Sequence, residues 1–203
     1  DMKKFGWVDV SKNLQDRLRK CLEYFGVSSV NEWQIKYGDP VNLAAFRTTS
    51  AFEPNIGAVS AWIRRGEILS QEIDCKSWDA ALFKENLFKI KELTREKNPE
   101  IFLPKLRKLC SDCGVALVIV RTPSGCMASG ATKFLSPHKA LMLLSFRYLS
   151  DDQFWFTFFH EAGHLLLHGK RAFFIEEKGK NKNTIQEEIE ANQFAGDILI
   201  NGR

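Results

Sequence analysis

The sequence contains no long uninterrupted hydrophobic run, and it does not open with the basic and apolar segments of a secretion signal. Its most apolar stretch, residues 154–167, is too short to span a bilayer and is interrupted by His160, Glu161 and His164. These absences predict a cytoplasmic protein without a membrane partner.

A dense basic stripe is also absent. The formal net charge is only +4, and the Lys and Arg residues are scattered along the chain. Direct binding of DNA by these residues is therefore not favoured, because phosphate contacts require clustered cations. The hydrophobic fraction of 44% is that of an ordinary globular protein and is sufficient for one large domain or two small ones.

The cysteines do not form the paired motifs of a zinc finger or a disulfide scaffold. There are five, an odd number, and only Cys110 and Cys113 form a CxxC motif. Without a second pair, this motif is a weak signal for zinc or for redox chemistry. Reduced thiols in a cytosolic protein are the preferred interpretation.

Apolar residues recur at helical spacing through the first half of the chain. The predicted helices cover residues 11–25 (with Ser11 as the cap), 29–37, 56–73, 78–96 and 100–110. No catalytic constellation is present in this half. We therefore expect an all-helical module over residues 1–97.

The pattern changes after Gly114, where β-branched and apolar runs predict strands. The expected strands cover residues 115–120, 127–134 and 139–146, and a three-stranded meander is their simplest pairing. A helix should follow from Asp151 or Asp152 to His168, and Gly169 should stop it. A short strand (171–176) and a polar loop (178–183) then precede a last helix that begins at Thr184.

These elements predict an α+β fold. A helical N-terminal module is followed by a small antiparallel sheet packed on the helix at 151–168, and by a C-terminal helix. The second domain should cover residues 98–203. Because the chain starts at Asp1 without an initiator Met and stops just after an apolar helical run, we expect it to be a fragment of a longer protein.

Residues 160–164, HEAGH, form an HExxH motif within the apolar helix. Residues four apart on a helix differ by only about 40° in direction, so His160 and His164 can bind one Zn²⁺ ion. The Glu161 side chain is turned about 100° around the helix from that of His160, and it can act as a general base on a water at the metal. Two core histidines bonded to carbonyl groups are the alternative, but they would leave Glu161 unexplained.

A catalytic zinc has three protein ligands and one open position. His168 would lie about 12 Å along an unbroken helix from His160, so we expect it to close the helix before Gly169 instead of binding the ion. The third ligand must then come from another element.

The last helix offers three carboxylates, Glu187, Glu188 and Glu190. A capping box with Thr184 would occupy Glu187. Glu188 shares its face with residues suited to close packing: Ala191, Asn192, Ala195 and Leu199. We therefore predict Glu188 as the third ligand, with Glu190 on a more polar face as the alternative. Asn192 could orient a ligand imidazole.

The segments HEAGHLLLHG (160–169) and EIEANQFA (188–195) resemble the ImmA/IrrE family of gluzincin-like metallopeptidases, and the resemblance extends over about residues 101–203. It implies His160, His164 and Glu188 as zinc ligands and Glu161 as the base. Family members typically cleave a helix-turn-helix repressor and so release stress or mobile-element genes.

The resemblance implies a zinc endopeptidase whose partner is a repressor or antitoxin-type regulator. Residues 1–97 are similar to the linker region of larger antitoxin-like regulators in which a helix-turn-helix domain precedes the peptidase domain, which implies a linker or regulatory module. DNA would be bound only through such a helix-turn-helix domain, and none is evident in this chain. The alternative is an antitoxin-like transcriptional regulator in which the peptidase fold serves as a sensor or interaction module with little proteolysis. An intact Glu161 favours the enzyme.

A peptide substrate needs a slot for an extended chain beside the ion, which an exposed edge strand could supply by strand addition. The strands at 127–134 and 139–146 are the candidates, and Ser129-Gly130-Ala131 is small enough for a close backbone approach. A turn or bulge glycine is the alternative for Gly130. Arg147 and Tyr148 could stabilise an oxyanion or could be ordinary surface residues.

Overall fold

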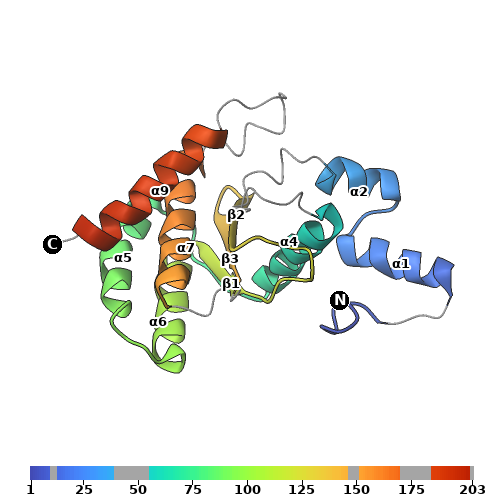
Figure 1. Ribbon diagram of the computed structural model, residues 1–203, viewed down its shortest axis with the longest axis horizontal. Coiled ribbons are helices and arrows are strands. Elements are labelled where there is room, and N and C mark those ends of the chain that lie inside the picture. Colours follow the sequence, from blue (N-terminus) through green and yellow to red (C-terminus); the bar gives the residue numbers. More distant parts are fainter. Residues whose placement is uncertain (10–12, 39–54, 146–150, 170–183, 202–203) are drawn as a thin grey trace.

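The computed structural model describes residues 1–9, 13–38, 55–145, 151–169 and 184–201. Within these ranges the elements are α1 (Leu14–Phe25), α2 (Val30–Tyr37), α4 (Ile56–Gln71), α5 (Ala80–Leu93), α6 (Pro99–Ser111), β1 (Val115–Ile119), β2 (Gly130–Ser136), β3 (Lys139–Leu144), α7 (Asp151–Gly163), the π-helical turn η1 (His164–His168) and α9 (Thr184–Asn201). Figure 1 shows the sheet between α4 on one side and α7 with α9 on the other. The predicted α+β class is confirmed.

The helices begin at side-chain caps that the sequence contains. Ser29 accepts a hydrogen bond from the backbone N–H of Glu32 at the start of α2, and Asp79 caps α5 in the same way. For α1 the prediction was wrong, because Asn13 caps the helix and Ser11 lies outside the described residues. All five predicted helices are present, with ends shifted by up to three residues.

The sheet order is β1-β3-β2, so the predicted meander is wrong. β2 and β3 form an antiparallel hairpin, but β1 pairs with β3 in parallel, which makes the small sheet mixed instead of antiparallel. β3 has the sequence KALMLL and takes the centre, where it can be covered on both faces and both edges. β2, with Thr132 and Lys133, takes an edge that tolerates polar residues.

Alternate residues of the strands face two different layers of helices. Leu117, Met142 and Leu144 pack in a core with α5, α6, α7 and α9. Leu141 and Leu143 point the opposite way and pack against α4, where Trp62 is fully buried. This two-sided burial explains why the strands read as nearly continuous apolar runs.

The helices of the predicted N-terminal module contribute to three separate clusters. α5 packs in the core with α7 through Phe83, Leu87 and Ile90, while α4 covers the other face of the sheet. α1 and α2 form a third cluster with α4 around Tyr24 and Phe25. The domain boundary at residues 97 and 98 stays a prediction.

A buried charge network ties α2 and α4 to the edge strand β2. The Glu67 carboxylate is 7% exposed and accepts hydrogen bonds from Lys133 at 3.0 Å, Arg64 at 3.0 Å and the Tyr37 hydroxyl at 3.2 Å. Burial opposes its ionisation, but the two cations outweigh that effect and lower the pKa of Glu67. The charge is therefore buried without being left unpaired.

Two further observations bear on the sequence predictions. Within the described residues, no helix is long and apolar enough to cross a membrane. All five cysteines are unbridged, and Cys110 and Cys113 are buried in the core. The predicted strand at 171–176 and loop at 178–183 lie outside the described residues.

Gly114, just before β1, provides a test of this packing. Its φ is +84°, and a Cβ there would lie 2.4 Å from the backbone N and Cα of Trp78. Gly6 has a similar φ of +66° but no atom within 4 Å of its Cβ position. We expect Gly6→Ala to cost about 1–2 kcal/mol from backbone strain, and Gly114→Ala at least about 3 kcal/mol. Urea unfolding measures both, and equal losses would contradict the contact with Trp78.

Candidate metal centre

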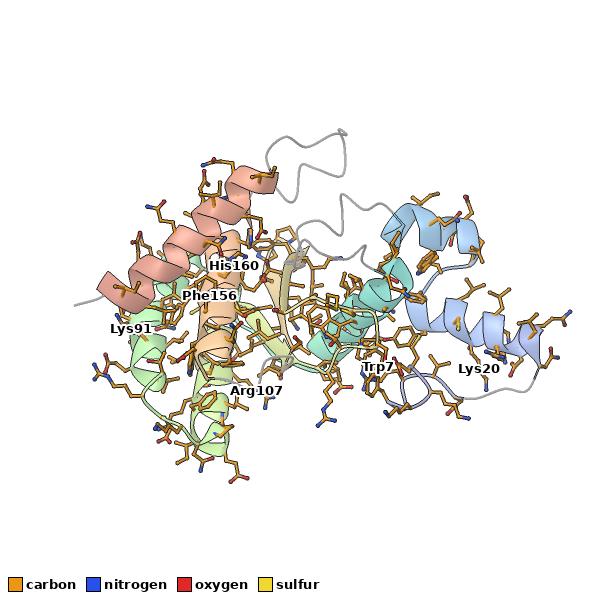
Figure 2. All side chains as sticks on the ribbon, in the orientation of Figure 1. Trp7, Lys20, Lys91, Arg107, Phe156 and His160 are labelled. Carbon is orange, nitrogen blue, oxygen red and sulfur yellow. The ribbon has the colours of Figure 1, made fainter. Side chains whose placement is uncertain are left out.

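Helix α7 is a core helix that carries polar residues. Phe158 and Phe159 are fully buried against the sheet layer, and His160 and Glu161, which follow them, are also 0% exposed. Figure 2 places His160 on the part of α7 that α9 crosses, with Phe156 one turn earlier. Because burying unpartnered polar groups is costly, such a helix must provide partners or a function for each of them.

Helix α9 approaches α7 closely because the residues at the crossing are small. Ala191 and Ala195 are fully buried. A Cβ on Gly163 would lie only 3.2 Å from the Cα of Ala191. The prediction that this face of the last helix suits close packing is confirmed, and the crossing brings Glu188 over the HExxH motif.

Three side chains converge on one point. His160 Nε2 and His164 Nε2 are 3.0 Å apart, and the Glu188 carboxylate lies 3.1 Å from His164 Nε2 and 3.5 Å from His160 Nε2. All their ligand atoms lie within 4.8 Å of one another, and no other such group of at least three occurs in the described ranges. His160 is fully buried, whereas Glu188 is 27% exposed, so the group faces solvent on the side of α9.

These distances match the donor spacing of a tetrahedral zinc site. With bonds of about 2.0–2.1 Å, neighbouring donors around a tetrahedral ion are about 3.3–3.4 Å apart. The measured separations of 3.0, 3.1 and 3.5 Å bracket that value. Oxygen and imidazole nitrogen are also the ligands that zinc prefers. The three residues therefore fit a divalent cation with one position left over.

Each imidazole has a partner behind it. His160 Nδ1 lies 3.1 Å from Asn192 Oδ1, and because an amide oxygen only accepts, the ring donates from Nδ1 and presents its Nε2 lone pair to the centre. His164 Nδ1 lies 3.2 Å from His168 Nδ1. The predicted orienting role of Asn192 agrees with this geometry and stays a prediction.

Glu161 has no comparable partner. Neither of its carboxylate oxygens has a hydrogen-bond partner, although Thr132 on β2 lies near enough to favour its charged form slightly. The lack of a side chain at Gly130 lets β2 lie close to Glu161, because a Cβ at this position would lie 2.4 Å from Glu161 Oε1. Burial raises the pKa of Glu161 to about 7, against the opposing charges of His164 and His160.

Glu188 behaves in the opposite way. Burial disfavours its charge, but the hydrogen bonds and charges of His160 and His164 outweigh burial and lower its pKa to about 2. The surroundings of the two carboxylates therefore separate their pKa values: Glu188 is held ionised, whereas the pKa of Glu161 lies near 7.

The structure places the remaining candidates as follows. Glu190, the alternative ligand, bonds His168 Nε2 at 2.9 Å and is not part of the converging group. His168 is buried beside His164, a contact that sequence analysis missed, as it missed the contact of Gly130 with Glu161. The third histidine at the i+4 spacing was the available signal. Arg147 and Tyr148 lie outside the described residues.

An HExxH helix on a small sheet, with a carboxylate from a second helix, defines a metallopeptidase-like domain. Residues 115–203 match the family model described as Peptidase_M78, IrrE N-terminal-like domain. The predicted resemblance to the ImmA/IrrE family is confirmed for these residues. Comparisons of the chain with curated proteins and with solved structures found no match.

The raised pKa of Glu161 predicts a pH-dependent penalty in the metal-free protein. Below its ordinary value of 4.5 the carboxyl is neutral in both the folded and unfolded states. As pH rises towards 7, only the unfolded state ionises freely, so stability is lost. Glu161→Gln cannot ionise, and its advantage in unfolding free energy should grow to roughly 3 kcal/mol above neutrality.

Urea unfolding of the metal-free proteins between about pH 4 and about pH 8 measures this advantage. Glu100→Gln, which removes an exposed carboxylate of α6, is the control and should show little pH-dependent gain. An advantage of Glu161→Gln that stays constant over this range would show that the carboxylate is not held in a dry site.

Proposed function

We propose that the domain is a zinc-dependent endopeptidase. The observation that carries this proposal is the convergence of His160, His164 and Glu188, with the unpaired Glu161 carboxylate on the same helix. A structural zinc site would need the three ligands but not Glu161. The match to a peptidase family supports the same reaction class.

In this proposal His160, His164 and Glu188 hold the ion, and Asn192 keeps the His160 ring oriented. When bound there, zinc would supply a Lewis acid that lowers the pKa of water. Glu161 accepts a proton from the attacking water and later donates it to the departing amine. Burial raises the pKa of Glu161 to about 7 in the metal-free site, and a bound cation would lower it, which would leave the carboxylate ionised and able to accept that proton.

The edge strand β2 supplies the slot for the substrate. Among the described residues β2 pairs only with β3, and we propose that an extended peptide adds to its other edge. Gly130 opens this strand in contact with Glu161, which would bring a peptide bonded along β2 to the base. Of the two strands considered from sequence, β3 is excluded because it is central.

We further propose that the substrate is a helix-turn-helix repressor or antitoxin-type regulator, in the control of stress, mobile-element or phage-defence genes in the cytoplasm. This part rests on the family resemblance. The alternative is an antitoxin-like regulator whose peptidase fold is a sensor, and it would retain zinc without cleaving. The unpaired Glu161 favours the enzyme, because selection for a sensor alone gives no reason to bury that carboxylate.

Glu161→Gln and His160→Ala should separate chemistry from metal binding. Glu161→Gln should keep zinc and lose at least about 100-fold in cleavage rate, because it removes the proton acceptor. His160→Ala should lose the metal. Metal analysis of protein purified without added metal gives the first readout, and digestion of unstructured peptides and candidate repressors gives the second. Unchanged zinc in a His160→Ala, His164→Ala double variant would refute the site.

Gly130→Ala tests the placement of Glu161. Its Cβ would meet Glu161 Oε1 at 2.4 Å and push the carboxylate away, so cleavage should fall while zinc content stays constant. Gly196→Ala on α9, where a Cβ meets nothing within 4 Å, is the matched control and should leave cleavage unchanged. Equal cleavage by both variants would show that β2 does not position the base.

A further inference from the structure

A hydrogen-bonded chain runs outward from His164, on the side of the ring away from the metal centre. His164 Nδ1 lies 3.2 Å from Nδ1 of His168, and His168 Nε2 lies 2.9 Å from Glu190 Oε2. Gln186 donates to the other Glu190 oxygen at 3.0 Å. His168 is only 6% exposed, so its contact with His164 is shielded from water, whereas the Glu190 side chain at the outer end of the chain is 43% exposed.

The chain has one self-consistent arrangement of protons for neutral rings. The Glu190 carboxylate only accepts, so His168 carries its proton on Nε2. The lone pair of His168 is then on Nδ1, and it accepts from Nδ1–H of His164. A neutral His164 with its proton on Nδ1 presents a lone pair at Nε2, the atom that faces His160 and Glu188.

The local backbone supports this arrangement. The segment from His164 to His168 is a π-helical turn, whereas the preceding α7 is α-helical. π-Helical turns are uncommon in proteins, and many of those that occur lie at functional sites. At the end of this turn Gly169 packs on β2, where a Cβ would lie 2.6 Å from the ring of Phe134. The turn is therefore held against the sheet while its two histidines stay in contact.

We infer that His168 and Glu190 are positioning residues, which lock His164 in the Nδ1–H tautomer and aim its Nε2 at the metal. The inference rests on the proposed metal site but goes beyond it, because neither residue touches the ion. His160 and His164 then have different supports, a neutral amide for the first and a histidine–carboxylate pair for the second. Loss of such supports typically weakens metal binding by about 10–100-fold.

Zinc affinity, measured by competition with a chromophoric chelator, tests the chain. His168→Phe removes the acceptor for His164 Nδ1–H and should weaken zinc binding about 10–100-fold. His168→Asn offers an amide oxygen and should restore most of that affinity. Glu190→Ala should weaken binding in the wild-type background and add little to His168→Phe, because both changes break the same chain.

Glu187→Ala is the matched control on α9. This substitution removes a negative charge near His164 from a residue that is not part of the hydrogen-bonded chain. It should change the zinc affinity much less than Glu190→Ala does. Equal effects of the two variants would reduce the role of Glu190 to charge alone and overturn the inference. So would wild-type affinity in His168→Phe, or failure of His168→Asn to restore binding in a protein that folds normally by circular dichroism.

Nitrogen-15 NMR of the metal-free wild-type protein tests the tautomer without any substitution. Burial is outweighed by the contact with Glu188, which raises the pKa of His164, so the spectrum is recorded at a pH high enough to keep this ring neutral. Neutral His164 should carry its proton on Nδ1, and a neutral ring protonated on Nε2 would overturn the inference. Failure of the proposed function would be distinguishable from this result. The proposed function fails if the wild-type protein binds no zinc, or if it binds zinc and cleaves none of the peptides tested. Failure of the inference alone leaves zinc binding and cleavage by the wild-type protein intact and zinc affinity unchanged in the variants.

Discussion

The close crossing of α7 and α9 is the contact on which the site depends. Helix α7 and the π-helical turn η1 that continues it supply two imidazoles one turn apart, and these cannot define a cation site without a third donor. Gly163 on α7 and the buried Ala191 and Ala195 on α9 let the helices approach until Glu188 reaches both rings. The small residues therefore set the distance between the Glu188 carboxylate and the two imidazole rings, because a larger side chain at the crossing would move the carboxylate away from the rings.

Burial is the second constraint. The buried polar groups of α7 and η1 differ in whether they have hydrogen-bond partners. His160 is bonded to Asn192, and His164 is bonded to His168, which in turn bonds Glu190. Glu161 alone is left without a bond to either oxygen, and its pKa rises to about 7. Burial thus leaves each imidazole fixed by a hydrogen bond and leaves the Glu161 carboxyl with a raised pKa.

Local signals predicted much of this structure. The helices follow from apolar spacing and caps such as Ser29 and Asp79, and the face of Glu188 was distinguished from that of Glu190 by its small residues. The sheet order was mispredicted, because strand pairing depends on which strand can be covered on both faces and both edges. His168 was assigned only to the helix end, since the sequence does not reveal a π-helical turn.

The sequence by itself determined the chemistry that is available: HExxH on an apolar helix, and a carboxylate on a small-residue face of the last helix. Both follow from spacing along single helices, which local geometry sets. Only the tertiary structure decided which carboxylate meets the imidazoles, which strand forms the edge beside Glu161, and which groups support each ring. All three are contacts between segments that are distant in the chain. Close packing at the helix crossing and at the sheet determines these contacts, whereas the pattern within a single segment does not.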